Sequence, residues 1–401
     1  MAIGPRPKPP HGEFVGTARQ FPPPIDFAHV SVFGLVRNDR SHGLFNLHCN
    51  ICRVTDTSCS RPGVRMTSTK QLNRLPIRVR RRRNVEASSP YVVAALAAAA
   101  LAATALLNRH LAKKAEHDNP PAGRFMDVDG VRLHYVERGS GEPLVLLHGN
   151  GSMIQDFESS GLVGLASKSY RVIVIDRPGF GHSSRPRNVV WTPDAQAQLI
   201  RRALERLDVS QAIVLGHSWG ASVAVALALK FPDLVSGLVL ASGYYYPTLR
   251  PDVVALSAPA VPVLGDVMGH TLSPLISRLM WPFVIAKIFG PKSAPAKFGQ
   301  FPKEMALRPS QIRAAAAESA LMIPDAFHFK DKYAELKMPI VIIAGEDDRL
   351  IDIDKQSARL HSDVSQSALR RVAHNGHMIH QTATGEVMAA INEVAKNCPP
   401  D

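Results

Sequence analysis

The segment GHSWG at residues 216–220 constrains the fold of this chain more than any other feature. It stands between the apolar run 212–215 and an alanine-rich stretch, so a buried strand is predicted to turn at once into a helix. Such a turn holds its central serine, Ser218, in a strained and exposed conformation. Side chains at Gly216 and Gly220 would collide with the strand and the helix. The pattern therefore predicts a nucleophile elbow.

Two groups that could activate a serine follow further along the chain. The continuous apolar run 339–344 is typical of a strand buried in a parallel sheet, and the acidic turn with Asp348 comes directly after it. The run 368–372 predicts the last strand, and the loop after it carries His377. The chain order is thus serine, acid, histidine, which differs from the orders found in chymotrypsin-like and subtilisin-like enzymes.

The region from about residue 123 to 397 resembles the serine branch of the α/β-hydrolase fold superfamily. Five motifs carry the resemblance in chain order: LHGNG at 147–151, DRPGFGHS at 176–183, the elbow, the acidic turn and the terminal histidine loop. The resemblance implies an α/β fold with a mostly parallel, twisted, eight-stranded sheet flanked by helices and a helical cap inserted after the sixth strand. The expected organisation is a basic, disordered extension at 1–88, an anchor helix at 89–110, the hydrolase core at 120–243 and 323–398, and the cap at 244–322.

The strands of that sheet can be placed from the hydrophobic pattern. A hairpin is predicted over 124–137, with Asp129 and Gly130 in its turn. The remaining predicted strands are 144–147, 171–175, 212–215, 237–241, 340–344 and 368–372. Helices are expected between them, notably at 193–207 and 384–396.

The resemblance implies a catalytic triad of Ser218, His377 and Asp348. A serine hydroxyl needs a base within hydrogen-bond reach, and an imidazole can both take and return its proton. The acid then holds the imidazole tautomer and stabilises the imidazolium. The rival candidates are His374 and His380 for the base and Asp347 for the acid, although Asp347 is expected to be a surface charge.

An oxyanion hole is expected from two backbone N–H groups. One belongs to Trp219, the residue after the nucleophile, and the other is implied to be that of Asn150, which follows His148 and Gly149. Glycine in this loop allows close approach of the backbone to the serine. His148 is expected to anchor the loop and not to act as a base.

Serine as the nucleophile limits the reaction. The elbow is similar to that of epoxide hydrolases and haloalkane dehalogenases, which carry aspartate where Ser218 stands here. A carboxylate that attacks an alkyl carbon forms an ester that water cleaves, whereas a serine would form an ether with no acyl carbon for water to attack. A cofactor-free carboxylesterase is therefore the first hypothesis. The alternatives are a cofactor-free perhydrolase or haloperoxidase, a carbon–carbon bond hydrolase, and, outside the enzymes, a catalytically silent membrane-tethered binding module.

The insertion at 244–322 is rich in Leu, Ile, Ala, Met, Phe and Pro and predicts an apolar cap over a pocket for a small apolar acyl substrate. Tyr244 and Tyr245 follow the sixth predicted strand at its carboxyl end, where open α/β sheets bind ligands, so they are candidate pocket residues.

Helices are predicted within the cap at 272–288 and 310–321, and these helices are expected to be broken at Pro274, Pro282 and Pro291. The proline ring removes a backbone donor and clashes with the preceding turn, which is the reason for placing helix breaks there.

Residues 91–107 form an uncharged apolar run. As a helix this run would be about 25 Å long, against a bilayer core of about 30 Å, and it predicts a single-pass anchor that contacts membrane lipid. A soluble alanine-rich helix and a signal-peptide core are the alternatives. Arginines are denser before the run than after it, so the positive-inside rule places the catalytic domain on the extracytoplasmic side.

The net charge of +13 comes mainly from residues 1–90, which hold 15 Lys or Arg against 5 Asp or Glu. The basicity therefore predicts an arm at anionic headgroups and no nucleic-acid binding by the folded domain. His48, Cys49, Cys52 and Cys59 lack a second C-x-x-C pair, so no metal site is expected. The sequence leaves open whether the protein is a monomer or a homo-oligomer.

Overall fold

A computed structural model describes residues 89–398. The expected basic extension at 1–88 and its cysteines lie outside this range. The eight strands are β1 (Arg124–Val128), β2 (Val131–Arg138), β3 (Glu142–Leu147), β4 (Tyr170–Ile175), β5 (Ala212–His217), β6 (Val235–Ala241), β7 (Ile340–Gly345) and β8 (Ser367–Val372).

The strands form one sheet in the order β1-β2-β4-β3-β5-β6-β7-β8. β2 pairs antiparallel with β1 and β4, and all other pairs are parallel. Asp129 (φ 51°) and Gly130 (φ 78°) form the hairpin turn between β1 and β2, as predicted. The predicted eight-stranded, mostly parallel sheet is confirmed.

Helices cover both faces of the sheet. They are α2 (Ile154–Ser160), α3 (Leu162–Ala166), α4 (Pro193–Glu205), α5 (Trp219–Lys230), α11 (Arg359–Asp363), α12 (Ile379–Thr382) and α13 (Thr384–Asn397). Alternate residues of the central strands enter two separate cores, because side chains of a strand alternate between faces. Val145 and Leu147 pack with α4 and α5, whereas Leu144 and Leu146 pack with α2, α3 and α13.

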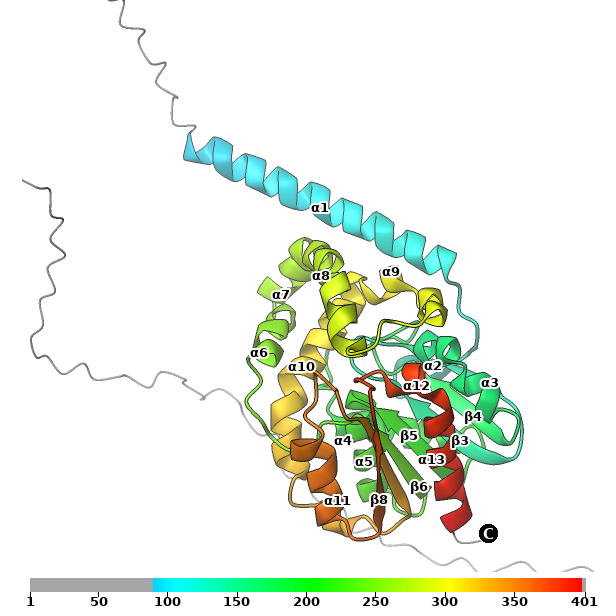
Figure 1. Ribbon diagram of the computed structural model, residues 1–401. Coiled ribbons are helices and arrows are strands. Elements are labelled where there is room, and N and C mark those ends of the chain that lie inside the picture. Colours follow the sequence, from blue (N-terminus) through cyan, green and yellow to red (C-terminus); the bar gives the residue numbers. More distant parts are fainter. Residues whose placement is uncertain (1–88, 399–401) are drawn as a thin grey trace, which may run out of the picture. The chain divides into compact units, whose positions relative to one another are not determined.

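The insertion between β6 and β7 is helical, as predicted. Its helices are α6 (Pro251–Leu256), α7 (Leu264–His270), α8 (Leu272–Phe289), α9 (Lys303–Ala306) and α10 (Pro309–Phe329). Figure 1 shows α6 to α9 gathered beyond the carboxyl ends of the strands, where the elbow and the histidine loop lie.

The expected break at Pro282 was wrong, because Pro282 lies inside α8. The second cap helix, predicted at 310–321, is longer than expected: α10 continues through Pro324 to Phe329. Pro274 stands in the first turn of α8, where its missing N–H has no intrahelical acceptor to lose. Pro291 follows the end of α8 and agrees with a helix stop there. One missing donor is tolerated within a long packed helix because neighbouring turns keep their hydrogen bonds.

α1 (Pro90–Asp118) is longer than the expected anchor at 89–110. Within the described residues, α1 and α8 are each long and apolar enough to cross a membrane, and the 18-residue apolar window of α1 contains no buried residue. The carboxyl-terminal part of α1 contacts the cap helices α7 to α10.

Candidate active site

The elbow has the strained geometry that its sequence predicts. Ser218 joins β5 to α5 with φ 54° and ψ −119°, and its N–H donates to the carbonyl of Ala241 at 2.8 Å. A Cβ at Gly216 would lie 2.3 Å from the Gly220 carbonyl oxygen, and a Cβ at Gly220 would lie 2.1 Å from that of Leu147. Both glycines are therefore required by the close approach of strand and helix.

The predicted acid and base are hydrogen-bonded to each other. His377 Nδ1 lies 2.8 Å from Asp348 Oδ2, and both side chains are almost fully buried. The other oxygen of Asp348 accepts the N–H groups of Leu350 (2.8 Å) and Ile351 (3.0 Å). These bonds fix the carboxylate so that it orients the imidazole.

The side chains of the rival candidates for the base and the acid lie beside other groups. The His374 side chain is 90 % exposed, with Nδ1 4.0 Å from Asp347 Oδ2. His380 is buried and paired with Asp156, at 3.0 Å between Nε2 and Oδ1. The geometry therefore favours the His377–Asp348 pair over every alternative that the sequence left open.

The histidine loop is held by the cap as well as by the core. The N–H groups of His377 (3.1 Å) and Met378 (3.3 Å) both point to the carbonyl of Ile288, in the last turn of α8. On the core side, His217 Nε2 donates to the His377 carbonyl at 3.0 Å, and the two rings are 5.0 Å apart. Since His217 directly precedes Ser218, these bonds fix His377 beside the elbow.

The loop of His148, Gly149 and Asn150, which is predicted to supply one N–H of the oxyanion hole, also lies against Ser218. A Cβ at Gly149 would lie 3.1 Å from Ser218 Cβ, which is tighter than an ordinary contact, so glycine lets the loop approach the serine without displacing it. The N–H of Trp219, the first residue of α5, has no intrahelical acceptor. The Asn150 side chain donates to the Ala315 carbonyl (3.0 Å) and to Ser319 Oγ (3.1 Å) of α10, which ties the loop to the cap.

His148 is an anchor of this loop, as expected. Its Nε2 accepts the backbone N–H of Arg177 at 3.0 Å, and its Nδ1 donates to the Gly149 carbonyl at 2.8 Å. Burial, with the charge of Arg177, lowers the pKa of His148 to about 3. The imidazole therefore stays neutral, and both nitrogens are used in hydrogen bonds.

A fully buried ion pair, which the sequence analysis did not predict, joins the same loop to the cap. Arg177, at the end of β4, pairs with Glu318 on α10, and both side chains have no exposed surface. The Arg177 guanidinium also donates to the carbonyls of His148 (2.8 Å) and Gly149 (3.0 Å). The two partners are 141 residues apart in the chain, so no spacing pattern could reveal them.

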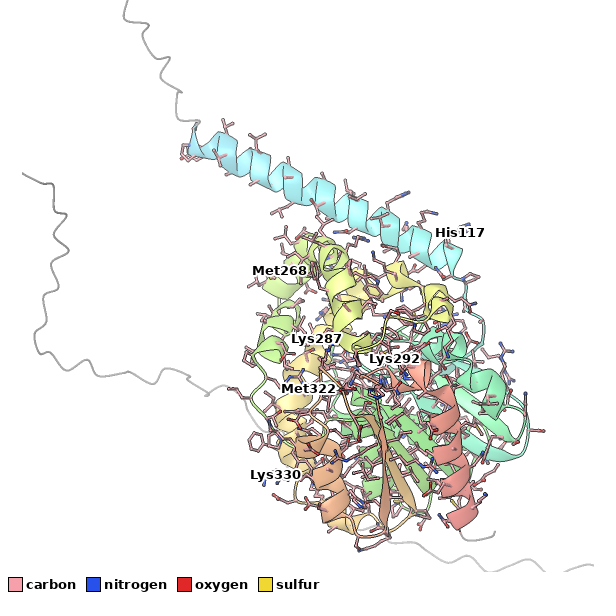
Figure 2. The ribbon with its side chains drawn as sticks, viewed as in Figure 1. His117, Met268, Lys287, Lys292, Met322 and Lys330 are labelled. Atoms are coloured by element: carbon pink, nitrogen blue, oxygen red, sulfur yellow. The ribbon has the colours of Figure 1, made fainter. Side chains whose placement is uncertain are left out.

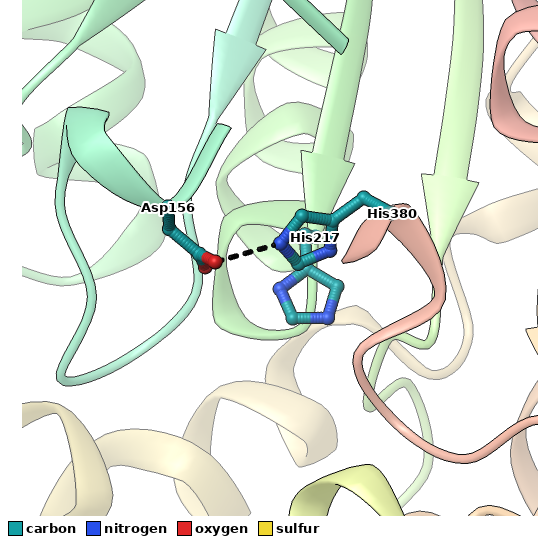
Figure 3. A group of neighbouring side chains, drawn as sticks. All are labelled: Asp156, His217 and His380. Atoms are coloured by element: carbon teal, nitrogen blue, oxygen red, sulfur yellow. Dashed lines mark ion pairs between the residues drawn. The ribbon is translucent and has the colours of Figure 1, made fainter. Parts of the chain in front are cut away.

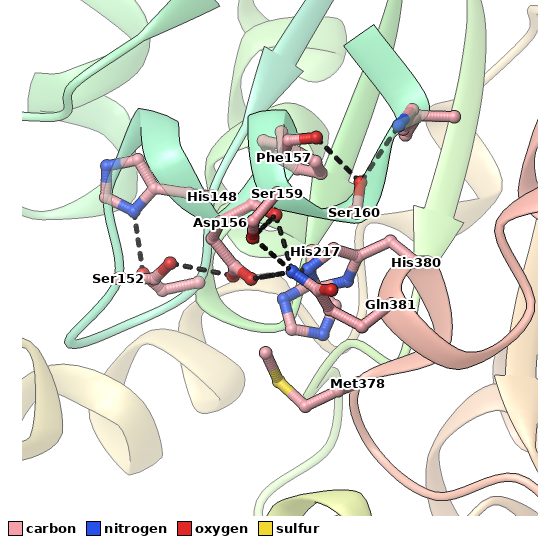
Figure 4. A network of polar contacts seen from close by, with 12 residues as sticks. His148, Ser152, Asp156, Phe157, Ser159, Ser160, His217, Met378, His380 and Gln381 are labelled. Atoms are coloured by element: carbon pink, nitrogen blue, oxygen red, sulfur yellow. Dashed lines mark hydrogen bonds and ion pairs between the residues drawn. The ribbon is translucent and has the colours of Figure 1, made fainter. Parts of the chain in front are cut away.

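A second buried network lies behind the histidine loop (Figure 4). Asp156 on α2 accepts Ser152 Oγ at 2.8 Å and Gln381 Nε2 at 3.0 Å, in addition to its pair with His380. Burial opposes ionisation of Asp156, but His380, His217 and Gln381 together outweigh burial and lower the pKa of the carboxyl. The network pins α12, which immediately follows the histidine loop, to α2.

Asp156, His217 and His380 offer donor atoms within 4.8 Å of one another, the spacing of a metal site (Figure 3). Hydrogen bonds already engage Asp156 Oδ1 and Oδ2 and His217 Nε2. Burial, with the nearby His380 and His377, holds the pKa of His217 well below its ordinary value, so its ring is neutral. The hydrogen bonds of Asp156 and His217 therefore suit this cluster to holding the histidine loop in position.

The candidate pocket tyrosines differ in their surroundings. Tyr245 lies in the core with its ring against Tyr333, at 6.2 Å between centroids. Tyr244 packs with Ala326 and with Ile351, close to the acidic turn. Neither tyrosine lines the hollow of about 600 Å³ that lies between α8 and Arg349, the residue after Asp348.

Asp325 on α10 is a buried carboxyl with an unpaired oxygen, Oδ2. Burial, with the charges of Asp194 and Glu318, raises its pKa to about 7. Because the folded pKa lies above the unfolded one, ionisation favours the unfolded state, and stability falls as the pH rises from about 4 to about 7. Asp325→Asn should remove this loss, which amounts to as much as about 4 kcal/mol at pH 8.

The measurement is the difference in unfolding free energy between Asp325→Asn and the wild type, taken by urea titration at pH 5 and pH 8. Asp331→Asn is the matched control, because the Asp331 side chain is 78 % exposed. A difference that does not grow with pH for Asp325→Asn would contradict the prediction.

The geometry can now be compared with known proteins. The sequence model described as alpha/beta hydrolase fold matches residues 142–384, more than half of the chain. The chain belongs to the alpha/beta hydrolase fold family. Members of this family include hydrolytic enzymes, and the eight-stranded sheet and helical cap of this hydrolase agree with the match.

Among curated proteins, the hydrolase is 28 % identical over 280 residues to an uncharacterized hydrolase, YugF, of Bacillus subtilis, covering 65 % of this chain and 92 % of the relative. It is 27 % identical over 294 residues to the 2-hydroxy-6-oxononadienedioate/2-hydroxy-6-oxononatrienedioate hydrolase of Escherichia coli, covering 68 % and 94 %. Among solved structures, a thermophilic esterase from Thermogutta terrifontis has a TM-score of 0.58 at 21 % identity, covering 69 % and 99 %. The last likeness shows the fold alone.

Proposed function

We propose that this hydrolase is a membrane-anchored serine carboxylesterase that cleaves an apolar acyl ester through an acyl-enzyme. Ser218 is the nucleophile, His377 the general base and then acid, and Asp348 the group that orients the imidazole. The backbone N–H groups of Asn150 and Trp219 form the oxyanion hole. Water then releases the acid and restores the serine.

The observation that carries the proposal is the convergence of three strand ends. Ser218 follows β5, Asp348 follows β7 and His377 follows β8, and the 2.8 Å bond between His377 and Asp348 is already formed. The carboxyl ends of parallel strands share one edge of the sheet, which is where open α/β sheets hold their ligands.

A carbon–carbon bond hydrolase is the second candidate, favoured by the activity for which the Escherichia coli relative is named. The name of that relative's substrate is that of a dicarboxylate, which needs cations for binding. In this chain the buried guanidinium of Arg177 is neutralised by Glu318 and donates to loop carbonyls. The apolar cap supports an uncharged acyl chain as the substrate, whereas Lys292 and Arg349, which line the hollow of about 600 Å³, would suit a carboxylate.

We further propose that α1 anchors the protein in a membrane, with the catalytic domain on the extracytoplasmic side. The support is the length of α1 and the exposure of its apolar residues, among them Tyr91 (83 % exposed), Leu96 and Leu106. In a water-soluble protein this surface would be covered.

The test is labelling of the full chain, purified in detergent, with a fluorophosphonate, and location of the adduct by mass spectrometry. We expect rapid labelling at Ser218 and none in Ser218→Ala, with labelling of His377→Ala slower by about 10³-fold or more. Hydrolysis of p-nitrophenyl esters of increasing chain length, beside a vinylogous 1,5-diketone, then separates an esterase from a carbon–carbon hydrolase.

If the folded chain is not labelled by the fluorophosphonate, the serine hydrolase proposal is overturned. The remaining interpretation is then a catalytically silent binding module. Cleavage of the diketone in preference to every ester would move the second candidate to the front.

A further inference from the structure

Exposed large hydrophobic side chains are concentrated in two parts of the described region, α1 and residues 249–284 of the cap. Outside these parts, the described residues 89–398 expose Leu165, Val189, Val190 and Phe327. The cap alone exposes fourteen: Leu249, Val254, Leu256, Val261, Val263, Leu264, Val267, Leu272, Leu275, Ile276, Leu279, Met280, Phe283 and Val284. Isolated apolar residues on a surface are ordinary, but a patch of this extent marks an interaction surface.

α8 carries its apolar stripe on the outer side. Residues 272, 275, 276, 279, 280 and 283 follow the i, i+3, i+4, i+7 spacing of one helix face, and all are exposed. Leu279 is 73 % and Phe283 is 66 % exposed. In a helix at the surface of a water-soluble protein, the apolar face is buried and the polar face is exposed. α8 is apolar on both sides: Trp281, Ile285 and Phe289 pack inward, and a second apolar stripe is left exposed.

A buried asparagine fixes the position of α8 relative to the anchor. Asn108 stands directly after the apolar run of α1, and its side-chain amide donates to the carbonyls of His270 (3.0 Å) and Thr271 (2.7 Å). Its Oδ1 accepts Arg278 Nη1 at 3.1 Å. If residues 91–107 lie in a bilayer, the corner between α7 and α8 therefore lies at the surface of that bilayer.

Groups suited to a membrane surface stand at the edge of the stripe. Arg109 and Lys113 follow Asn108 on α1. Lys287, labelled in Figure 2, stands in the last turn of α8, and its Nζ lies 3.6 Å from Asp252 Oδ2. Basic residues prefer the headgroup region, where their charges meet anionic lipids.

The opposite side of α8 faces the catalytic machinery. Trp281, Ile285 and Ala286 line the hollow of about 600 Å³, together with Arg349, which directly follows Asp348. The last turn of α8 supplies the carbonyl of Ile288 that holds the histidine loop. One helix thus separates the outer apolar stripe from a space beside the catalytic acid.

We propose that the apolar stripe of α8, with the exposed residues of α7, lies in a lipid leaflet, and that the substrates are esters carried in that leaflet. This inference rests on the serine hydrolase proposed above and names its substrate class. Burial of the stripe supplies the binding energy, and the cationic edge contacts anionic headgroups.

The test places a photoreactive benzoylphenylalanine at Phe283, at Leu96 of α1, or at Val190 of the core, each in the full chain reconstituted into vesicles of phosphatidylcholine and phosphatidylglycerol. We expect lipid adducts at positions 283 and 96 and none at 190, where Val190 is 69 % exposed. A lipid adduct at 96 without one at 283 would overturn the proposal and leave the anchor. Adducts at neither position would overturn both, and adducts to protein at 283 would assign the stripe to a protein partner.

A second measurement reads the substrate class. In the double variant Leu279→Asp and Phe283→Asp, the ratio of vesicle-ester to soluble-ester hydrolysis should fall at least about tenfold, because two large apolar side chains are lost from the interface. Val190→Asp should leave the ratio unchanged, and an equal ratio in the double variant would contradict the proposal. Fluorophosphonate labelling of Ser218 is scored separately, so failure of the hydrolase and failure of the lipid surface are distinguishable.

Discussion

Replacement of Asp348 by asparagine is expected to lower kcat for a soluble ester by about 10⁴-fold. The amide keeps the shape of the side chain, but it cannot stabilise the imidazolium. Its NH₂ group would also favour the wrong tautomer of His377, since Asp348 Oδ2 now faces His377 Nδ1 at 2.8 Å. The measurement is the steady-state hydrolysis of a p-nitrophenyl ester by the full chain in detergent.

Asp347→Asn is the matched control for this experiment. Asp347 adjoins Asp348 in the chain, but its side chain is 47 % exposed and lies 4.0 Å from the exposed His374. Its replacement should change kcat less than about twofold, because an exposed pair contributes little. Equal losses in the two variants would assign the effect to the turn and not to the triad.

Replacement of Glu318 by alanine is expected to destabilise the folded state by about 3–5 kcal/mol, because it leaves the guanidinium of Arg177 buried without a counter-charge. For a folded region of this size the expected fall in Tm is about 10 °C. Activity should also fall at temperatures where the protein remains folded, since Arg177 holds the carbonyls of His148 and Gly149. Thermal unfolding in detergent and the ester assay measure the two effects.

Glu205→Ala provides the comparison for stability. Glu205 pairs with Arg201 on the surface of α4, and both side chains are at least 40 % exposed. Loss of that pair should cost no more than about 1 kcal/mol. If Glu318→Ala were as mild as Glu205→Ala, the buried pair would have no role in holding the loop.

The sequence could predict those parts of the molecule that follow from local pattern. The alternation and length of apolar runs located all eight strands, and the need for glycine at Gly216 follows from the contact of β5 with α5. Those features depend on neighbours within a few residues. The same holds for the turn at Asp129 and Gly130, which needs positive φ angles.

Other features depend on contacts between distant segments and could not be predicted. Asp156 and His380 are far apart in the chain, and nothing in the local sequence of either residue indicates the other. The local sequence predicted a break at Pro282, but α8 continues through this proline because tertiary contacts hold the helix together. The exposure of the apolar stripe of α8 could not be predicted either. Helical spacing shows which residues share a face, but it does not show whether that face is buried or exposed.

The hydrogen bonds from His377 and Met378 to the carbonyl of Ile288 make the cap part of the catalytic apparatus. A cap that swung away from the sheet would carry this carbonyl with it and release the loop that holds the base. If His377 is the base proposed above, hydrolysis should stop while α8 is displaced, and a ligand that holds α8 away from the sheet should act as an inhibitor.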